Sequence, residues 1–190
     1  MLNVVLVGAG GISKSHIAAW LKQDNARVIG VADFFGDRAE AAAKVLGAEK
    51  WSDDYRDLID SDSVDAVDIC VTEAVHVAVA TDVANAGKHI LVEKPGSKNL
   101  NEISKIISKV KKGKTKIRVG FNHRYHPSII KAQEVIKSGV IGKPMYLRGR
   151  YGHGGRLRYE KEWRAKPSIS GGGELIDQGS HLIDLSRLFL

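Results

Sequence analysis

The sequence predicts an α/β protein in which a doubly wound parallel sheet is followed by the beginning of a second, α+β domain. Through residue 121, short apolar runs typical of buried parallel strands alternate with helical segments. This alternation demands crossover connections and helices on both faces of the sheet. The alternation stops after Phe121, so we expect domains at 1–121 and 122–190. With 190 residues, the chain is long enough for one full domain and part of another.

The expected strands are short runs rich in β-branched residues, at 3–8, 27–33, 65–71, 89–93 and 116–121. Helical patterns lie between them, at 12–22, 37–47, 55–60, 76–88 and in the lysine-rich segment that follows the strand at 89–93. Beyond residue 121, the pattern predicts a helix and turn over 126–143, an exposed strand over 144–152, a long loop over 152–173 and a final helix.

The net charge of +7 is unevenly distributed along the chain. Residues 1–97 carry 9 Lys/Arg and 15 Asp/Glu, a net of −6, whereas residues 143–166 carry 8 and 2, a net of +6. The second block lies in a glycine-containing segment and favours an anionic ligand. We expect no nucleic-acid partner, because no nucleic-acid motif accompanies the charge.

Several absences favour a cytoplasmic protein. The N-terminus has no basic signal-peptide region, and no apolar run approaches the roughly 18 residues that a membrane helix needs. The single cysteine, Cys70, excludes an internal disulfide and fits a reducing compartment. We therefore expect no membrane partner.

The stretch "VGAGGIS" (7–13) follows the first predicted strand and opens the first helix. Gly8 allows a tight turn, and Gly10 lets the backbone approach a pyrophosphate resting on the helix N-terminus. Ser13 replaces the third glycine of the usual dinucleotide fingerprint and is still small. A plain strand–helix turn is the alternative, but the position in the first βα turn favours a dinucleotide.

Asp33 ends the second predicted strand, where an acidic side chain accepts both ribose hydroxyls of an adenosine. The same carboxylate repels a 2′-phosphate, so NAD is favoured over NADP. Arg38 lies near Asp33 in the sequence, so NADP stays an alternative cofactor.

The stretch "VEKPG" (92–96) ends another predicted strand, at the sheet edge where such folds bind ligands. By itself, Glu93 next to Lys94 is more often a surface ion pair than a catalytic pair. Pro95 stiffens the turn, and its peptide bond can be cis. His76 lies at the same edge and is a candidate contact to a cofactor.

The stretch "GGGELIDQGSHLIDL" (171–185) places Asp177 and His181 on one face of the predicted final helix. From pattern alone, the polar stripe that contains them is best explained as facing solvent. A metal site is less favoured, because two ligands at this spacing have no clear third or fourth.

Together these motifs resemble the Gfo/Idh/MocA family, the group of glucose–fructose oxidoreductase and inositol dehydrogenase. The marks are "VGAGGIS" with His16, "GVAD" ending at Asp33, His76, "EKP" (93–95), "GFNHRYHP" (120–127), "EWR" (162–164) and the final Asp–His helix. The resemblance covers essentially the whole chain and implies a Rossmann-type nucleotide domain before a substrate and dimerisation domain.

The resemblance implies roles for individual residues. Lys94, Asp177 and His181 are the expected catalytic residues, converging on the substrate carbinol and the nicotinamide ring. The expected cofactor contacts combine the glycine loop, the strand ends and second-domain residues: Gly8, Gly10, Gly11, Ile12, Asp33, Thr72, His76, Glu93, Lys94, Asn122, Trp163 and Arg164. Arg124 is a further candidate.

The chain departs from the family pattern in two ways. Glu73 follows Thr72 where the family has proline, which puts a negative charge near the expected cofactor site. The chain also ends before the large open sheet that forms the pocket floor and the dimer interface in the family, so the second domain is expected to be truncated. A homo-oligomer is expected for a full-length form.

The predicted function is therefore an NAD(P)-dependent oxidoreductase. It would transfer a hydride between the cofactor and a hydroxyl carbon of a sugar, cyclitol or derivative, including an anionic one. The alternative is a non-catalytic NAD-binding sensor or interaction protein, or an inactive fragment of such an enzyme.

Overall fold

The structure is a computed structural model that describes residues 1–113, 115–151, 157–162, 165–170 and 173–190. The chain divides into two compact units, Met1–Val119 and Gly120–Leu190. Among the described residues, none of the helices is both long and apolar enough to cross a bilayer.

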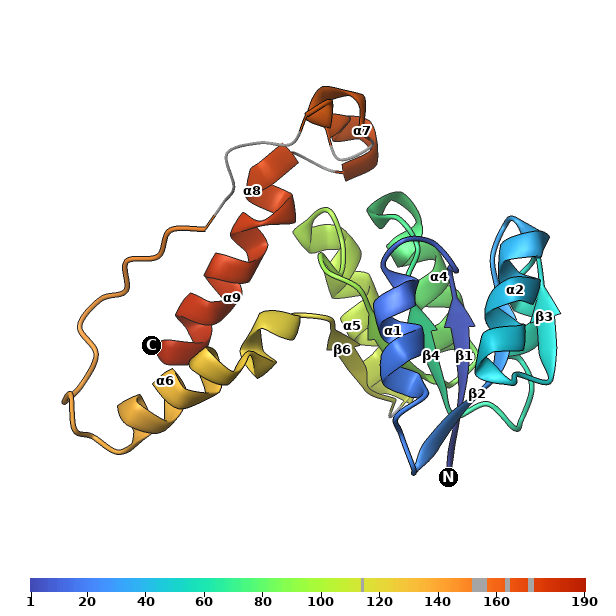
Figure 1. Cartoon of the computed structure of the whole chain (residues 1–190), viewed down its shortest axis with the longest axis horizontal. Coiled ribbons are helices and arrows are strands. Elements are labelled where there is room, and N and C mark those ends of the chain that lie inside the picture. The colour runs from blue at the N-terminus through green and yellow to red at the C-terminus, as the bar shows by residue number, and fades with distance from the viewer. Residues whose placement is uncertain (114, 152–156, 163–164, 171–172) are drawn as a thin grey trace. The chain divides into compact units, whose positions relative to one another are not determined.

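Unit 1 (Met1–Val119) is a single parallel sheet with helices on both faces (Figure 1). Its strands are β1 Leu2–Val7, β2 Ala26–Ala32, β3 Lys50–Ser52, β4 Ala66–Ile69, β5 His89–Val92 and β6 Ile117–Val119. Its helices are α1 Ser13–Trp20, α2 Gly36–Leu46, α3 Arg56–Ile59, α4 Glu73–Asn85 and α5 Leu100–Gly113. The expected doubly wound α/β fold is confirmed.

The six strands lie in the order β3-β2-β1-β4-β5-β6, and every pair is parallel. The chain therefore proceeds outward from β1 in one direction, returns to β4, and proceeds outward in the other direction. Ligands of such sheets bind beyond the strand carboxyl ends at this reversal. The reversal lies between β1 and β4, so the glycine loop after β1 and the loop after β4 lie on its two sides.

Alternation along the strands builds a core on each face of the sheet. Val4 and Leu6 pack with α1 and α2, whereas Val5 and Val7 pack with α4 and α5 (Figure 1). Successive strand residues point to opposite faces, so a strand buried on both sides is apolar at every position. These two cores fix the strand ends that carry the candidate site.

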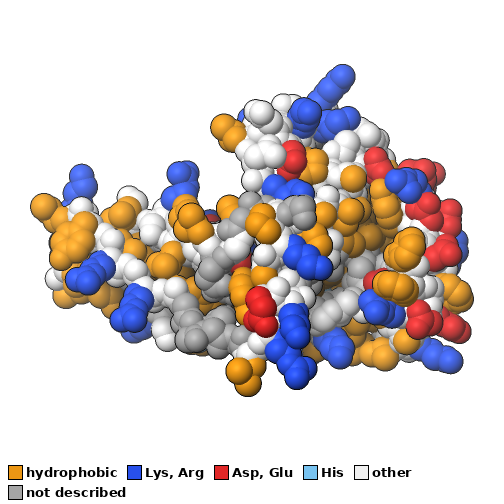
Figure 2. Space-filling model, turned by 90° about the horizontal axis from the view of Figure 1, so that it is seen from above, with side chains coloured by type: hydrophobic (Ala, Val, Ile, Leu, Met, Phe, Trp, Pro, Cys, Tyr) orange, Lys and Arg blue, Asp and Glu red, His pale blue; other side chains and the backbone are white. Residues whose placement is uncertain are grey.

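Strand β3, at the sheet edge, was not among the expected strands. Its three residues are too few to show a periodicity, and within the described part of the chain it pairs only with β2. The acidic character of the first half is visible on the surface. Figure 2 shows most of the Asp and Glu side chains on that face gathered at the end of unit 1 where α2 and β3 lie.

Unit 2 (Gly120–Leu190) is helical in its described part. It contains η1 Asn122–Tyr125, α6 Pro127–Lys137, η2 Tyr159–Lys161, α7 Pro167–Ser170, α8 Gly173–Asp177 and α9 Gly179–Phe189. The His126 side chain caps α6 by accepting a hydrogen bond from the Ser128 N–H. Proline at the first position suits a helix start, because its missing N–H is not needed there.

Two expectations for this unit are wrong. The strand expected over 144–152 is absent from 144–151, where Met145 and Tyr146 are exposed. A strand needs a hydrogen-bonded neighbour, and the described residues offer it none. The loop expected over 152–173 contains the short helices η2 and α7 within its described residues.

The final helix is interrupted rather than continuous. It is divided at Gln178 into α8 and α9. The solvent-facing stripe that the pattern alone favoured is not found: Asp177, His181 and Asp184 are buried, with exposures of 5%, 5% and 6%. Leu175 and Ile183 are exposed instead. The polar side of α8 and α9 is therefore covered, and part of their apolar side faces solvent.

Candidate functional site

The glycine loop lies at the carboxyl end of β1, at the sheet reversal. Gly8 has φ +97°, and a Cβ there would lie 2.7 Å from the Cys70 carbonyl group, so only glycine fits. By contrast, a Cβ on Gly10 or Gly11 would meet nothing within 4 Å. Backbone that is open in this way next to the N-terminus of α1 suits a phosphate group.

Ser13 and Ile12 complete the loop. The Ser13 hydroxyl donates to the Gly10 carbonyl at 2.7 Å and is almost fully buried. Ser13 therefore replaces the third glycine and ties the loop back onto α1. Ile12 is the N-cap residue of α1 and is partly exposed.

Asp33 lies beside this loop, at the end of β2. Its carboxylate accepts the Ala9 N–H at 2.7 Å and the Phe35 N–H at 2.9 Å. Each oxygen retains acceptor capacity for a ligand hydroxyl. Arg38 lies over the Phe35 ring, with 4.3 Å from its guanidinium carbon to the ring centroid.

The loop after β4 lies across the reversal from the glycine loop. Thr72 is the N-cap residue of α4, and Glu73 is buried in the first turn of that helix. A carboxylate in the first turn interacts favourably with the helix dipole. The departure from the family pattern at Glu73 therefore fits a regular helix start.

Lys94 lies in the segment after β5, between two residues that are held by histidines. The Lys94–Pro95 peptide bond is cis, as the sequence allowed. One ring nitrogen of His76 lies 2.8 Å from the Pro95 carbonyl oxygen, and the other lies 2.9 Å from that of Val71. His76 is buried and uses both ring nitrogens within the protein. Its expected contact with a cofactor stays a prediction.

The second histidine of this edge, His16, lies in α1. Its Nδ1 is 2.8 Å from Asp68 Oδ2, and its Nε2 is 3.1 Å from Glu93 Oε1. Burial lowers the pKa of His16, but hydrogen bonds to Asp68, Cys70 and Glu93 outweigh it and raise the pKa to about 12. We therefore interpret His16 as an imidazolium between two carboxylates.

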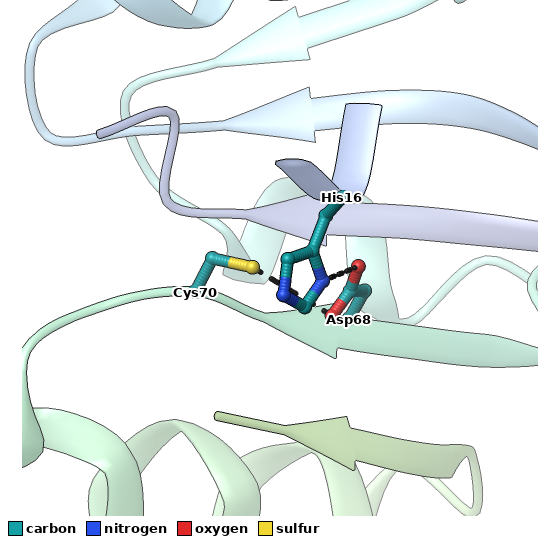
Figure 3. Close-up of side chains that lie close together, drawn as sticks. All are labelled: His16, Asp68 and Cys70. Atoms are coloured by element: carbon teal, nitrogen blue, oxygen red, sulfur yellow. Dashed lines mark hydrogen bonds and ion pairs between the residues drawn. The ribbon is translucent and has the colours of Figure 1, made fainter. Parts of the chain in front are cut away.

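Asp68 is completely buried in β4, where an unpaired charge would be costly. Besides His16, it accepts the Trp20 indole N–H at 2.7 Å and the Cys70 thiol at 3.7 Å. Figure 3 shows His16, Asp68 and Cys70, whose possible metal-ligating atoms all lie within 4.8 Å of one another. Because these atoms already satisfy one another, we interpret the cluster as a hydrogen-bonded network.

In unit 2, His181 lies in a cluster of rings. It stacks on His123 with centroids 3.8 Å apart, and Phe121 and Tyr151 lie edge-on to it at 6.0 and 6.2 Å. His123 Nε2 lies 3.5 Å from the Tyr151 hydroxyl. Asp177 is buried at the end of α8 and accepts a hydrogen bond from the Gln178 amide at 3.3 Å.

Arg124 anchors η1 to α9 within this unit. Its guanidinium makes two hydrogen bonds to the carboxylate of Asp184, one of them from Nε at 2.7 Å. These hydrogen bonds raise the pKa of Arg124, so its guanidinium stays charged. Asn122 begins η1 and is exposed. Trp163 and Arg164 lie outside the described residues.

His16 was predicted only as a mark of resemblance, and no role was predicted for Asp68, His123 or Asp184. A buried charge inside an apolar strand, as at Asp68, was the available signal. Its partners are 48 and 52 residues away along the chain, so no local pattern identifies them.

Family models match both parts of the chain. Residues 2–121 match the model described as "Oxidoreductase family, NAD-binding Rossmann fold". Residues 129–190 match the model described as "GFO/IDH/MocA C-terminal domain".

Similar proteins are dehydrogenases. Levoglucosan dehydrogenase of Pseudarthrobacter phenanthrenivorans is 32% identical, over 98% of this chain and 50% of its own length. The NAD(+)-dependent scyllo-inositol 2-dehydrogenase of Bacillus subtilis is 33% identical, over 87% and 46%. A solved levoglucosan dehydrogenase in complex with NADH and levoglucosan has a TM-score of 0.91 and 31% identity, covering 100% of this chain and 54% of that one. The chain thus spans about half the length of these relatives.

Proposed function

The chain belongs to the GFO/IDH/MocA family of NAD-binding oxidoreductases, and from this premise we propose that it transfers a hydride between NAD and a hydroxyl carbon of a sugar, cyclitol or derivative. The single observation that carries the proposal is the geometry of the sheet reversal in unit 1. There, open glycine backbone, the Asp33 carboxylate and the Lys94 segment all lie at the carboxyl edge of one sheet.

The described residues fit a dinucleotide. Gly10 and Gly11 leave room for a pyrophosphate at the N-terminus of α1, and Asp33 beside the loop would accept ribose hydroxyls. Thr72, at the start of α4, lines the opposite side of the reversal. When bound, NAD supplies the hydride-accepting carbon. NADP remains a second candidate because of Arg38.

Lys94 supplies the positive charge of the proposed reaction. Its ammonium holds the carbinol oxygen of the substrate and stabilises the negative charge that develops there as the proton leaves. A half-buried lysine suits this role, because a partly desolvated charge interacts more strongly than one in water.

His181 is the proposed general base, and Asp177 orients either His181 or a substrate hydroxyl. An imidazole changes its protonation close to neutral pH, which suits the removal of a hydroxyl proton. Both side chains are buried, so neither is an ordinary surface residue. Asn122 and, outside the described residues, Trp163 and Arg164 are proposed as further cofactor contacts.

The domains proposed for these roles are a dinucleotide-binding domain over 1–121 and part of a substrate domain over 122–190. The substrate is proposed from the relatives, which are dehydrogenases of levoglucosan and inositol. For the same reason the sensor alternative is not favoured. A cytoplasmic location and a homo-oligomeric full-length form are also part of the proposal.

The decisive experiment measures NADH formation by the purified chain with a panel of inositols, anhydrosugars and sugar acids. Weak turnover is expected with at least one of them, because the chain spans about half the length of its relatives. His181→Ala should lower kcat by about 10²-fold or more and leave NAD affinity unchanged, because the imidazole acts on the substrate proton. Ile183→Ala, on the exposed side of the same helix, is the control. NAD binding without turnover of any polyol would favour the alternative, a sensor or an inactive fragment of such an enzyme.

A further inference from the structure

The segment that carries Lys94 is held on both sides of that residue. His16 bonds to Glu93 just before it, and His76 bonds to Pro95 just after it. The two histidines come from α1 and α4, which pack on opposite faces of the sheet. The segment is thus tied to both layers of helices around it.

Each histidine is itself fixed by its second ring nitrogen. That of His16 bonds to Asp68, which is also held by the Trp20 indole. That of His76 lies 2.9 Å from the Val71 carbonyl oxygen, in the loop after β4. Because a carbonyl oxygen only accepts, the tautomer of His76 decides which of the two contacts is an N–H···O hydrogen bond. Neither ring can rotate without losing hydrogen bonds in a largely buried site.

Anchoring the backbone on both sides of Lys94 restricts where its side chain can lie. A lysine side chain loses considerable rotamer freedom when it is ordered, and fixing the backbone on both sides removes the other source of freedom. A misplacement of about 1 Å can cost roughly 10²-fold in rate, so a rigid base for the side chain matters to catalysis.

We propose that His16 and His76 are positioning residues that hold Lys94 at the place where it meets the substrate oxygen. We call this pair the Lys94 clamp. The inference rests on the proposed function for the role of Lys94, but the holding of Lys94 by the clamp is tested separately below.

The first test is kinetic. His76→Phe keeps a ring in the buried site and removes both nitrogens. It should lower kcat about tenfold or more, which is a much larger loss than its effect on NAD affinity. His76→Gln, which keeps an N–H donor, should recover part of the loss. His89→Phe is the matched control, because His89 is exposed at the opposite end of β5.

A double-mutant cycle separates positioning from general stability. In a Lys94→Met background, His76→Phe should cause no further loss of kcat, because its effect acts through Lys94. Independent, multiplying losses would overturn the clamp. Equal losses of NAD affinity and kcat in His76→Phe would also overturn it, since they indicate a purely structural role.

The second test does not depend on turnover. Lysines of the intact chain are labelled by reductive methylation with ¹³C-formaldehyde, and the Lys94 signal is assigned by its absence in Lys94→Arg. In the His76→Phe and His16→Gln variants, this signal should move toward the position of exposed lysines and sharpen. An unchanged signal in a folded variant overturns the clamp. If the signal moves but the wild-type chain turns over no polyol, the proposed function fails and the clamp stands.

If His76→Phe does not fold, His76→Gln and His16→Gln carry both tests. The Lys94 signal should then shift more in His16→Gln, which loses the bridge between Asp68 and Glu93, than in the His89→Phe control. Equal signals in these two variants would count against the clamp.

Discussion

His181 stacks on His123 with ring centroids 3.8 Å apart and planes inclined by 13°. The two rings come from α9 and η1, and the Arg124–Asp184 ion pair joins the same two elements. Two imidazolium rings at this distance would repel each other. At most one of the two rings is therefore easily protonated to an imidazolium, and the other stays neutral with one ring nitrogen able to accept a proton.

This stack predicts a change in the pH dependence of turnover. His123→Phe keeps an aromatic ring against His181 and removes the titrating neighbour. The acid limb of the pH–rate profile should move to higher pH, because charge on His123 no longer opposes proton uptake by His181. The measurement is kcat against pH for both proteins. Arg124 and Asp184 are retained in both, so an unchanged acid limb would mean that the histidines are not coupled.

Asp33 is predicted to select the cofactor. In Asp33→Ala, NAD should bind about tenfold or more weakly, because hydrogen bonds to the ribose hydroxyls are lost. NADP should be weakened much less, because the carboxylate repels its phosphate. The measurement is the dissociation constant of each cofactor for wild type and Asp33→Ala, from NADH and NADPH fluorescence. Equal losses for the two cofactors would refute the ribose assignment, and Asp37→Ala in the first turn of α2 is the control.

His16 should make folding stability depend on pH. Its pKa is raised in the folded protein, so its contribution is fully present below the ordinary pKa of about 6.5 and is lost as pH rises through the folded value of about 12. The free energy of unfolding of wild type relative to His16→Gln should therefore fall as pH rises above neutrality, by up to about 1.4 kcal/mol per pH unit. Urea unfolding at several pH values measures it. A difference that stays constant with pH contradicts the imidazolium assignment.

Cys70 is predicted to be unreactive in the folded protein. Burial raises the pKa of its thiol to about 12, against the opposing effect of His16. Since the thiolate is the reactive form, a disulfide reagent such as Ellman's reagent should modify it only slowly at pH 8. Addition of urea should make the same thiol react rapidly. Fast modification of the native chain would show that the site opens readily.

The basic segment of unit 2 is predicted to favour an anionic substrate. Arg148, Arg150 and Arg158 are exposed there. Replacing Arg148 and Arg150 by Gln should raise KM for a sugar acid several-fold and leave KM for a neutral polyol unchanged, with the difference reduced by salt. Lys105→Gln with Lys109→Gln, on the exposed face of α5, is the matched control. Equal use of neutral and acidic substrates at all salt concentrations would leave these arginines as a solvated surface.

Local patterns in the sequence predicted most of unit 1. Strands β1 and β2 are apolar and β-branched, and a strand buried on both faces needs that composition along its whole length. The glycine loop was predictable from its glycines between a predicted strand and a predicted helix, and the structure gives Gly8 a positive φ against the Cys70 backbone. Strand β3 was not predictable, because three residues at an edge carry no periodicity.

The sequence by itself therefore determined the α/β fold and the glycine loop, because each depends on neighbours along the chain. The residues proposed to act on substrate were predicted from the resemblance to the family and not from local pattern. Tertiary structure decided what those residues touch. Residues 77 positions apart meet when His16 bonds to Glu93, and residues 58 positions apart meet when His181 stacks on His123. It also decided that the polar face of α9 is buried, which periodicity alone assigned to solvent. The physical reason is that helical spacing identifies which residues share a face, whereas only packing determines what covers that face.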